Sequence, residues 1–303
     1  MDKVDFAQFY DISLFIRHAS IRETLYLSGQ WKDPDNVFTY IAQGSAEFIL
    51  DGIKYLVSEG DAIIMHPFMP HIILTNISSS FIQYVIHFDL HFDPNRMKIK
   101  FLDEDYINLD EIIDKEMLFK TIQHVSSINI LHRRKIQSLF LEMTKSLKDC
   151  SPESHLVAKF CFTEIIYLYL KSLDNKHKSI TKETKGWIHI KKAITYINQK
   201  YYSNNIDNNE ISNYVGVTPS YLINLFREQL GIPLHKYLTY VRIQKAKYLL
   251  EKGDLTISEI AYKTGFLSIH SFSKIFKRET GLSPSSYTSD FTDSIPIEEI
   301  LDV

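Results

Sequence analysis

The chain has 303 residues, which is enough for two domains of ordinary size. Apolar residues make up 45% of it and charged residues 23%, a composition that excludes a disordered chain. The net charge of −3 is unevenly distributed, because residues 186–290 hold 13 Lys or Arg against 8 Asp or Glu, a net +5, and the rest carries −8. A polyanionic partner is therefore excluded for the whole chain but allowed for its C-terminal part.

Neither the cysteines nor the apolar stretches predict export or membrane insertion. Cys150 and Cys161 lack CxxC spacing, so no disulfide framework is expected. Residues 1–5 show no basic region followed by an apolar one. The most apolar stretch, residues 160–170, is shorter than the roughly 20 residues that a bilayer requires. We therefore expect a cytoplasmic protein with no membrane partner.

Short apolar runs separated by turn residues predict a β-rich N-terminal region. The predicted strands span residues 13–18, 24–28, 37–42, 46–50, 54–57, 62–65, 72–77 and 81–88. Asp51-Gly52 lies between two of these runs, which is a strong signal for a tight hairpin. Eight short strands at this spacing predict a sandwich or a small barrel.

A more specific pattern lies in the middle of this region. The sequence Gly60-Asp61-Ala62-Ile63-Ile64-Met65-His66-Pro67, followed by Pro70-His71, resembles a segment of the cupin barrel. Metal-binding cupins carry a His-x-His pair with a Glu on an earlier strand, and the matching stretch here, Asn36-Val37-Phe38-Thr39, lacks that pair. His66 and His71 alone are fewer than the three or four protein ligands of a usual metal site. We therefore expect no metal and no cofactor.

A barrel of about eight strands can still hold one small ligand in its mouth. The polar and aromatic candidates for lining such a site are Trp31, Tyr40, His66, His71, Tyr84 and His87. The alternative for each is an ordinary core or rim residue whose polar atoms are satisfied. Strand register decides which side chains point inward, and register does not follow from the sequence.

The hydrophobic period then changes from that of strands to that of helices. Helices are predicted over residues 109–125, 131–148 and 152–173, the last with apolar positions recurring every three or four residues. Its apolar surface either packs on the barrel or pairs with the same helix of a second copy. Residues 175–185 are polar and without apolar periodicity, which predicts a linker after an N-terminal domain of residues 1–174.

The second half contains an internal repeat. Residues 206–212 align with residues 255–261 at an offset of 49, and from Ser220 the offset is 50. Each copy begins with a capping pattern, Asp207-x-x-Glu210 or Thr256-x-x-Glu259. In each copy a glycine, Gly216 or Gly265, ends the short helix before a longer one begins. This order predicts two helix-turn-helix units within about seven helices over residues 186–290, followed by an acidic tail at 291–303.

These residues resemble the AraC/XylS family of bacterial transcription regulators. The matching segments are Glu259-Ile260-Ala261-(x)3-Gly265-Phe266, then residues 271–278, then Gly281-Leu282-Ser283-Pro284-(x)2-Tyr287. The resemblance implies an α+β fold, in which a cupin-like sensor and dimerisation domain precedes an all-α domain with two helix-turn-helix units. It also implies a homodimeric activator that binds specific double-stranded DNA, works with RNA polymerase and responds to a small molecule such as a sugar. Ser212, where the family usually has Ala, is a mild departure.

The second helix of each unit is where we expect contacts with DNA. Leu222, Leu225 and Phe226, like Phe272, Ile275 and Phe276, must face the core. The residues predicted to face DNA are Ser220, Tyr221, Ile223, Asn224, Arg227, His270, Ser273, Lys274, Lys277 and Arg278. Asn224 suits adenine, Lys274 guanine and Ile223 a thymine methyl group, while Arg227, Lys277 and Arg278 suit phosphates. The alternative is a solvated helix face.

Two other functions remain open at this point. One is a cupin-type enzyme acting on a sugar or a small acid, which the missing metal triad argues against, so that no enzymatic activity is expected. The other is a ligand-independent regulator whose barrel only dimerises.

Overall fold

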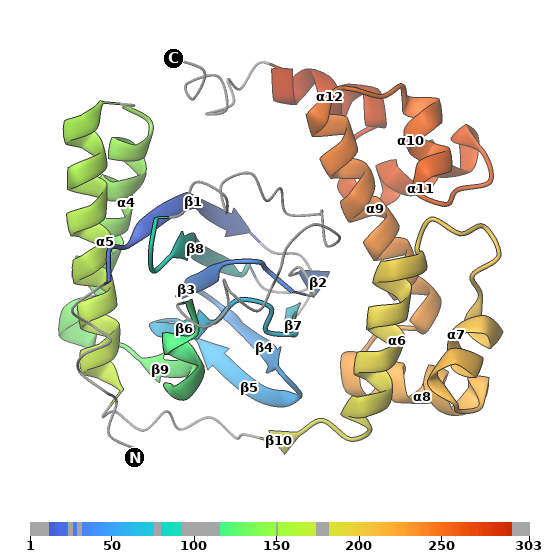
Figure 1. Ribbon diagram of the computed structural model, residues 1–303, viewed down its shortest axis with the longest axis horizontal. Coiled ribbons are helices and arrows are strands. Elements are labelled where there is room, and N and C mark those ends of the chain that lie inside the picture. Colours follow the sequence, from blue (N-terminus) through green and yellow to red (C-terminus); the bar gives the residue numbers. More distant parts are fainter. Residues whose placement is uncertain are drawn as a thin grey trace. The chain divides into compact units, whose positions relative to one another are not determined.

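The computed structural model describes residues 12–23, 27–28, 32–75, 80–92, 116–149, 151–173 and 182–292. It divides into two units, Met1–Glu183 and Thr184–Val303, each of which is described by itself (Figure 1). Trp31 and residues 293–303 of the predicted tail lie outside the described residues. None of the described helices has the length and apolar character needed to cross a membrane.

The first unit contains two five-stranded sheets in which all strand pairs are antiparallel. The first sheet has the order β1 (Phe15–Glu23), β8 (Ile82–Asp89), β3 (Asn36–Gln43), β6 (Asp61–Met65) and β9 (Val125–Ser127). The second has the order β10 (Lys182–Glu183), β5 (Ile53–Ser58), β4 (Ser45–Leu50), β7 (His71–Thr75) and β2 (Leu27–Ser28). β4 and β5 are joined by Asp51 and Gly52, both at positive φ, which confirms the predicted tight hairpin.

One core lies between the two sheets. Val37, Ile41 and Val85 of the first sheet pack there with Phe48 and Val57 of the second. Because side chains alternate along a strand, Thr39 and His87 share this inner face with Val37 and Val85. His71 lies two residues before the inward Ile73 and therefore faces the interior as well. The interior is thus apolar along much of its length and polar near the start of β3.

A second core lies on the opposite face of the first sheet, beneath helices α4 (Ile130–Leu147) and α5 (Pro152–Ser172) (Figure 1). Phe38 of β3 contacts Phe162 and Tyr169 of α5 with ring centroids 6.4 and 6.0 Å apart. These helices confirm the predictions for residues 131–148 and 152–173 to within a residue at each end. At least one face of each therefore packs on the barrel.

Two of the predicted ligand-lining residues lie in this second core instead of the barrel interior. Tyr40 is completely buried there, and the ring of Tyr84 stacks on Phe140 of α4 at 4.5 Å between centroids. Both tyrosines are an odd number of residues from inward-facing neighbours, so they point the other way. The prediction that Tyr40 and Tyr84 line a ligand site inside the barrel is therefore wrong.

The predicted helix over residues 109–125 is also wrong in its described part. That part contains the 3₁₀-helix η1 (Leu118–Thr121) and the strand β9, whose Val125 lies opposite Ile63 of β6. Short apolar runs do not distinguish a strand from a helix by periodicity, and here pairing with β6 decides. Likewise Lys182 and Glu183, within the predicted linker, form β10 by pairing with Lys54 and Ile53.

The second unit contains seven helices within residues 182–292. They are α6 (Trp187–Lys200), α7 (Asn208–Val215), α8 (Pro219–Leu230), α9 (Leu234–Lys252), α10 (Ile257–Lys263), α11 (Ile269–Thr280) and α12 (Pro284–Thr292). The pairs α7–α8 and α10–α11 are the two predicted helix-turn-helix units, and α9 connects them (Figure 1). α9 packs on the second helix-turn-helix unit through Ile243, Ala246 and Leu250. Its Tyr237 contacts Phe226 of the first helix-turn-helix unit.

The short helices begin where the capping patterns predict. The Asp207 side chain accepts a hydrogen bond of 2.8 Å from the backbone N–H of Glu210. Thr256 and Glu259 form a reciprocal capping box, and in addition the Thr256 hydroxyl donates to the Glu259 carboxylate at 2.7 Å. This side-chain hydrogen bond, with another from the Thr256 backbone N–H, lowers the pKa of Glu259.

The two glycines after these helices have the same backbone conformation in different surroundings. Gly216 and Gly265 both have φ of +83°, the left-handed region that a residue with a Cβ enters at a cost. A Cβ on Gly216 would meet nothing within 4 Å, whereas one on Gly265 would lie 2.5 Å from the backbone oxygen of Tyr201. That oxygen also accepts a hydrogen bond of 2.8 Å from Nε of Arg242 in α9. The glycine turn of the second helix-turn-helix unit is therefore packed closely against the end of α6.

This difference predicts unequal effects of the same substitution. Gly216→Ala should lower the free energy of unfolding by about 1–2 kcal/mol, the backbone cost alone. Gly265→Ala should lower it by clearly more, because the new methyl group also collides with a backbone oxygen. Calorimetry of the full chain measures both, and equal losses would show that the close approach at Gly265 has no energetic weight.

A second prediction concerns the buried tyrosines. The hydroxyl of Tyr40 is buried without a hydrogen-bond partner among the described residues, and burial raises its pKa to about 12. The hydroxyl of Tyr169 donates a 2.6 Å hydrogen bond to the backbone oxygen of Gln123. Tyr40→Phe should therefore leave stability unchanged or raise it, whereas Tyr169→Phe should cost about 1 kcal/mol. Thermal denaturation checks both, and a loss of stability in Tyr40→Phe would mean that its hydroxyl has a bound partner.

Candidate functional site

The second helix of each helix-turn-helix unit has one buried face. In α8 this face is formed by Leu222, Leu225 and Phe226, and in α11 by Phe272 and Phe276. The rings of Phe272 and Phe276 lie 5.5 Å apart, and Phe276 also contacts Tyr287 of α12 at 5.5 Å. Because these apolar side chains fix the rotation of each helix, the residues between them face solvent.

The residues predicted to contact DNA lie on the outer faces of these helices. In α8, Ser220, Tyr221, Asn224 and Arg227 are exposed and Ile223 is half-buried. In α11, His270, Lys274, Lys277 and Arg278 are exposed and Ser273 is half-buried. Each helix therefore presents a continuous outer surface with hydrogen-bonding and charged side chains.

The two outer surfaces differ in charge. α11 carries Lys274, Lys277 and Arg278 against Glu279, whereas α8 carries one cation, Arg227, beside Glu228. Arg278 donates to Glu279 through Nε at 2.8 Å and Nη2 at 2.7 Å, so part of its charge is neutralised locally. The second helix-turn-helix unit still has the more positive outer surface of the two.

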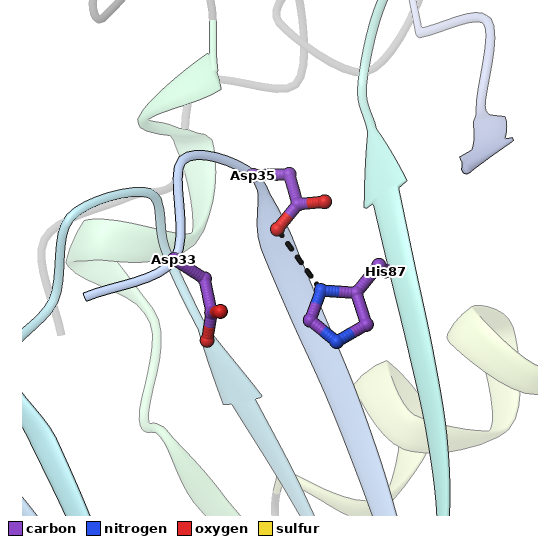
Figure 2. Close-up of side chains that lie close together, drawn as sticks. All are labelled: Asp33, Asp35 and His87. Carbon is purple, nitrogen blue, oxygen red and sulfur yellow. Dashed lines mark hydrogen bonds and ion pairs between the residues drawn. The ribbon is translucent and has the colours of Figure 1, made fainter. Parts of the chain in front are cut away.

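A separate group of polar side chains lies buried at one end of the barrel interior. We call Asp33, Asp35, His71 and His87 the Asp–His cluster; each is at most 5% exposed. Nδ1 of His87 lies 3.1 Å from Oδ1 of Asp35, and Nε2 of His71 lies 3.3 Å from Oδ2 of Asp33. Figure 2 shows both carboxylates, from the loop before β3, beside the ring of His87 on β8.

Two arginines flank the Asp–His cluster. Nε of Arg17 donates to Oδ2 of Asp89 at 2.6 Å and lies 3.9 Å from Oδ2 of Asp35. Nη2 of Arg22, an exposed side chain, lies 3.5 Å from Nε2 of His87. The buried carboxyl groups and imidazoles of the cluster thus lie beside one largely buried guanidinium group, that of Arg17, and one exposed one, that of Arg22.

Burial shifts the ionisation of this group. The pKa of Asp33 is raised, because desolvation penalises its charged form more than the nearby histidines favour it. For His87, desolvation alone would lower the pKa, but the charge of Asp35 and the hydrogen bond to it outweigh burial and the net shift is upward.

The structure brings together only some of the residues predicted to bind a ligand. His71 and His87 meet through Asp33 and Asp35, whereas Tyr40 and Tyr84 lie on the other face of the sheet. The ring of His66 lies 5.9 Å from that of His124, and its Nδ1 bonds to the oxygen of Pro67 at 2.8 Å.

Sequence reasoning missed Asp33 and Asp35. The search for metal ligands covered a His-x-His pair at residues 36–39, whereas the acidic pair stands immediately before that stretch with the same one-residue spacing. One ligand atom each from Asp33, Asp35 and His87 lie within 4.8 Å of one another, which makes these residues capable of holding a metal ion. The available signal was an Asp-Pro-Asp run just before a predicted strand of the barrel, where two carboxyl groups lie close together in sequence.

Comparisons with known proteins agree with the architecture of the second unit. The family described as a helix-turn-helix domain matches residues 211–290. The chain is 29% identical to the uncharacterized HTH-type transcriptional regulator YdiP of Escherichia coli over 55% of either chain. It is 24% identical to the Msm operon regulatory protein of Streptococcus mutans over 61% of this chain and 65% of that protein. The matches thus span less than two thirds of these relatives' lengths.

A solved structure is also similar to part of the chain. The C-terminal domain of AraT, a response regulator from Geobacillus stearothermophilus, is 31% identical over 34% of this chain and 84% of that domain, with a TM-score of 0.33. Residues 211–290 thus match the family of helix-turn-helix domains, in agreement with the two helix-turn-helix units that the structure contains there.

Proposed function

We propose that the chain binds specific double-stranded DNA in the cytoplasm through both helix-turn-helix units and activates transcription with RNA polymerase. The observation that carries this proposal is the pair of outer surfaces on α8 and α11, which stand at matching places in the two repeats. A recognition helix enters the major groove, where each base pair presents a distinct pattern of donors and acceptors.

The connecting helix supports simultaneous binding by both units. α9 has 19 residues without an internal glycine or proline and is therefore about 28 Å long at 1.5 Å per residue. Successive major grooves on one face of DNA are about 34 Å apart. A helix of this length, packed against both helix-turn-helix units, separates the two recognition helices by a distance similar to the spacing of the grooves.

Base readout and phosphate binding are assigned to different side chains. Asn224 suits an adenine edge and Lys274 a guanine edge, while Ile223 suits a thymine methyl group. Arg227, Lys277 and Arg278 are assigned to phosphates, which position the domain without reading sequence. Ser220, Tyr221, His270 and Ser273 complete the contact surface.

The barrel is assigned the role of sensor for a small polar molecule such as a sugar. Thr39, Thr75 and Gln83 are buried polar residues on inward-facing strand positions. The Thr75 hydroxyl has no hydrogen-bond partner among the described residues, so a polar ligand would satisfy a group that is otherwise buried at a cost.

Homodimerisation is assigned to α4 and α5. Leu131 is 81% exposed and Phe160 is 71% exposed, and Leu156 and Tyr167 add exposed apolar area on α5. Exposed apolar side chains gathered on two adjacent helices are typical of a surface that another chain covers. A ligand changes DNA binding only if it binds two arrangements of such a dimer with different affinity.

The DNA-binding proposal predicts a large effect of one lysine. After operator selection from a random duplex library with the wild-type chain, Lys274→Ala should weaken binding about tenfold to a hundredfold, the loss expected for one base contact. Lys145→Ala, which removes an exposed lysine of α4 in the first unit, should bind like wild type.

Salt titrations of the same variants separate base readout from phosphate binding. Lys277→Ala should weaken binding to all sequences alike and reduce the salt slope by about 1. Lys274→Ala should instead relax the preference for one base pair. If Lys274→Ala bound the selected operator with unchanged affinity and sequence preference, its assignment to a base would be wrong.

The sensor assignment predicts ligand-induced stabilisation. A sugar or other small polar metabolite that binds the folded barrel should raise the melting temperature of the full chain and change its affinity for the selected operator. Calorimetric screening of such compounds tests this. If no compound changed either quantity while operator binding persisted, the chain would be a ligand-independent regulator whose barrel only dimerises.

A further inference from the structure

The Asp–His cluster has a composition that DNA binding by the second unit does not require. Its residues come from three separate parts of the first unit: the loop before β3, the start of β7 and the end of β8. The loop is fixed in place, because the backbone N–H of Phe68 donates to the oxygen of Asp33 at 2.7 Å. The four side chains therefore converge through the fold and not through proximity in sequence.

The hydrogen bonding of His71 identifies which of its nitrogens faces Asp33. Nδ1 lies 3.0 Å from the backbone oxygen of Met69, which only accepts, so Nδ1 donates this hydrogen bond. Nε2 is then the nitrogen that faces the carboxylate of Asp33, 3.3 Å from its Oδ2. A histidine that donates from its other nitrogen to a backbone oxygen is the usual arrangement in metal-ligating histidines.

Two carboxylate oxygens of the Asp–His cluster are buried without a hydrogen-bond partner in the described part of the chain. Oδ1 of Asp33 and Oδ2 of Asp35 are buried without a hydrogen-bond partner among the described residues, although Arg17 lies 3.9 Å from the latter. Asp33, Asp35 and Asp89 thus place three buried carboxyl groups close to the guanidinium group of Arg17. A buried carboxyl oxygen without a partner is costly, and a bound divalent cation supplies that partner.

We propose that the Asp–His cluster binds one divalent first-row transition-metal ion, with Asp33, Asp35 and His87 as ligands and His71 beside Asp33 as the fourth donor. Carboxylate and imidazole donors together suit ions such as Zn²⁺ and Mn²⁺. The 3.1 Å between His87 Nδ1 and Asp35 Oδ1 and the 3.3 Å between His71 Nε2 and Asp33 Oδ2 are close to the separation of adjacent ligands about such an ion.

Metal binding requires one rearrangement of protons. Arg22 donates toward Nε2 of His87, so the His87 proton is on Nδ1, where it faces Asp35. When Nδ1 binds the ion, this proton moves to Nε2 and Arg22 turns away, so the ring stays neutral. Arg22 is exposed, and its 3.5 Å contact is at the limit of hydrogen bonding, so this movement disturbs little else.

The test uses the full chain after treatment with a chelator, titrated with ZnCl₂ or MnCl₂ in separate calorimetric experiments. We expect one ion per chain and a melting temperature raised by several degrees, with MgCl₂ at the same concentration giving a much smaller shift. Asp33→Asn and His71→Gln should each weaken the binding of the ion at least tenfold. Asp51→Asn and His155→Gln, which change an exposed carboxylate and an exposed imidazole of the same unit, should bind it like wild type.

Stability without metal distinguishes this site from an internal ion-pair network. Asp33→Asn replaces a buried, incompletely bonded carboxylate by a neutral amide and should melt at or above the wild-type temperature in the absence of metal. If wild type bound neither ion, or bound it equally well after both Asp33→Asn and His71→Gln, the proposal would be overturned. Should Asp33→Asn not fold, Asp35→Asn and His71→Gln decide by the same criteria. The inference goes beyond the proposed function, and its failure would leave the DNA-binding assignment intact, since that depends on the second unit alone.

Discussion

When one face of a helix or strand is buried, that burial determines which side chains its opposite face presents. Both parts of the chain depend on this constraint. In α8 and α11 the buried face is apolar, so the remaining positions are available to polar side chains. In β3 both faces are buried, one between the sheets and one beneath α4 and α5. Polar residues on that strand are therefore enclosed. The structure must provide each with a hydrogen-bond partner, or the unsatisfied group costs free energy of folding.

The two units use polar side chains in opposite environments. Lys274 and Asn224 stand in solvent, where a charge costs little and is available to a large polyanion. Asp33 and Asp35 stand in the barrel, where water does not compensate them and desolvation raises the pKa of Asp33. A protein that needed only a stable barrel would be served better by apolar residues of similar size at these positions. Their presence favours a role in binding over a role in stability.

Helix boundaries and the repeat were predictable because their signals are local. The Thr256–Glu259 capping box and the Asp207 cap involve residues three apart, and the left-handed glycines mark helix ends without reference to the rest of the fold. The Asp51-Gly52 hairpin is local in the same sense. The strand β9 and the placement of Tyr40 were not predictable, because they depend on which strand pairs with which and in which register.

The sequence by itself determined the two helix-turn-helix units, the residues on their outer faces and the β-rich character of the first unit. Only the tertiary structure decided that Asp33, Asp35, His71 and His87 meet inside the barrel while Tyr40 and Tyr84 face the helices. The physical reason is the range of the interactions. Caps, turns and helical faces are set by residues a few positions apart, whereas Asp35 and His87 are brought together across 52 positions by the pairing of β3 with β8.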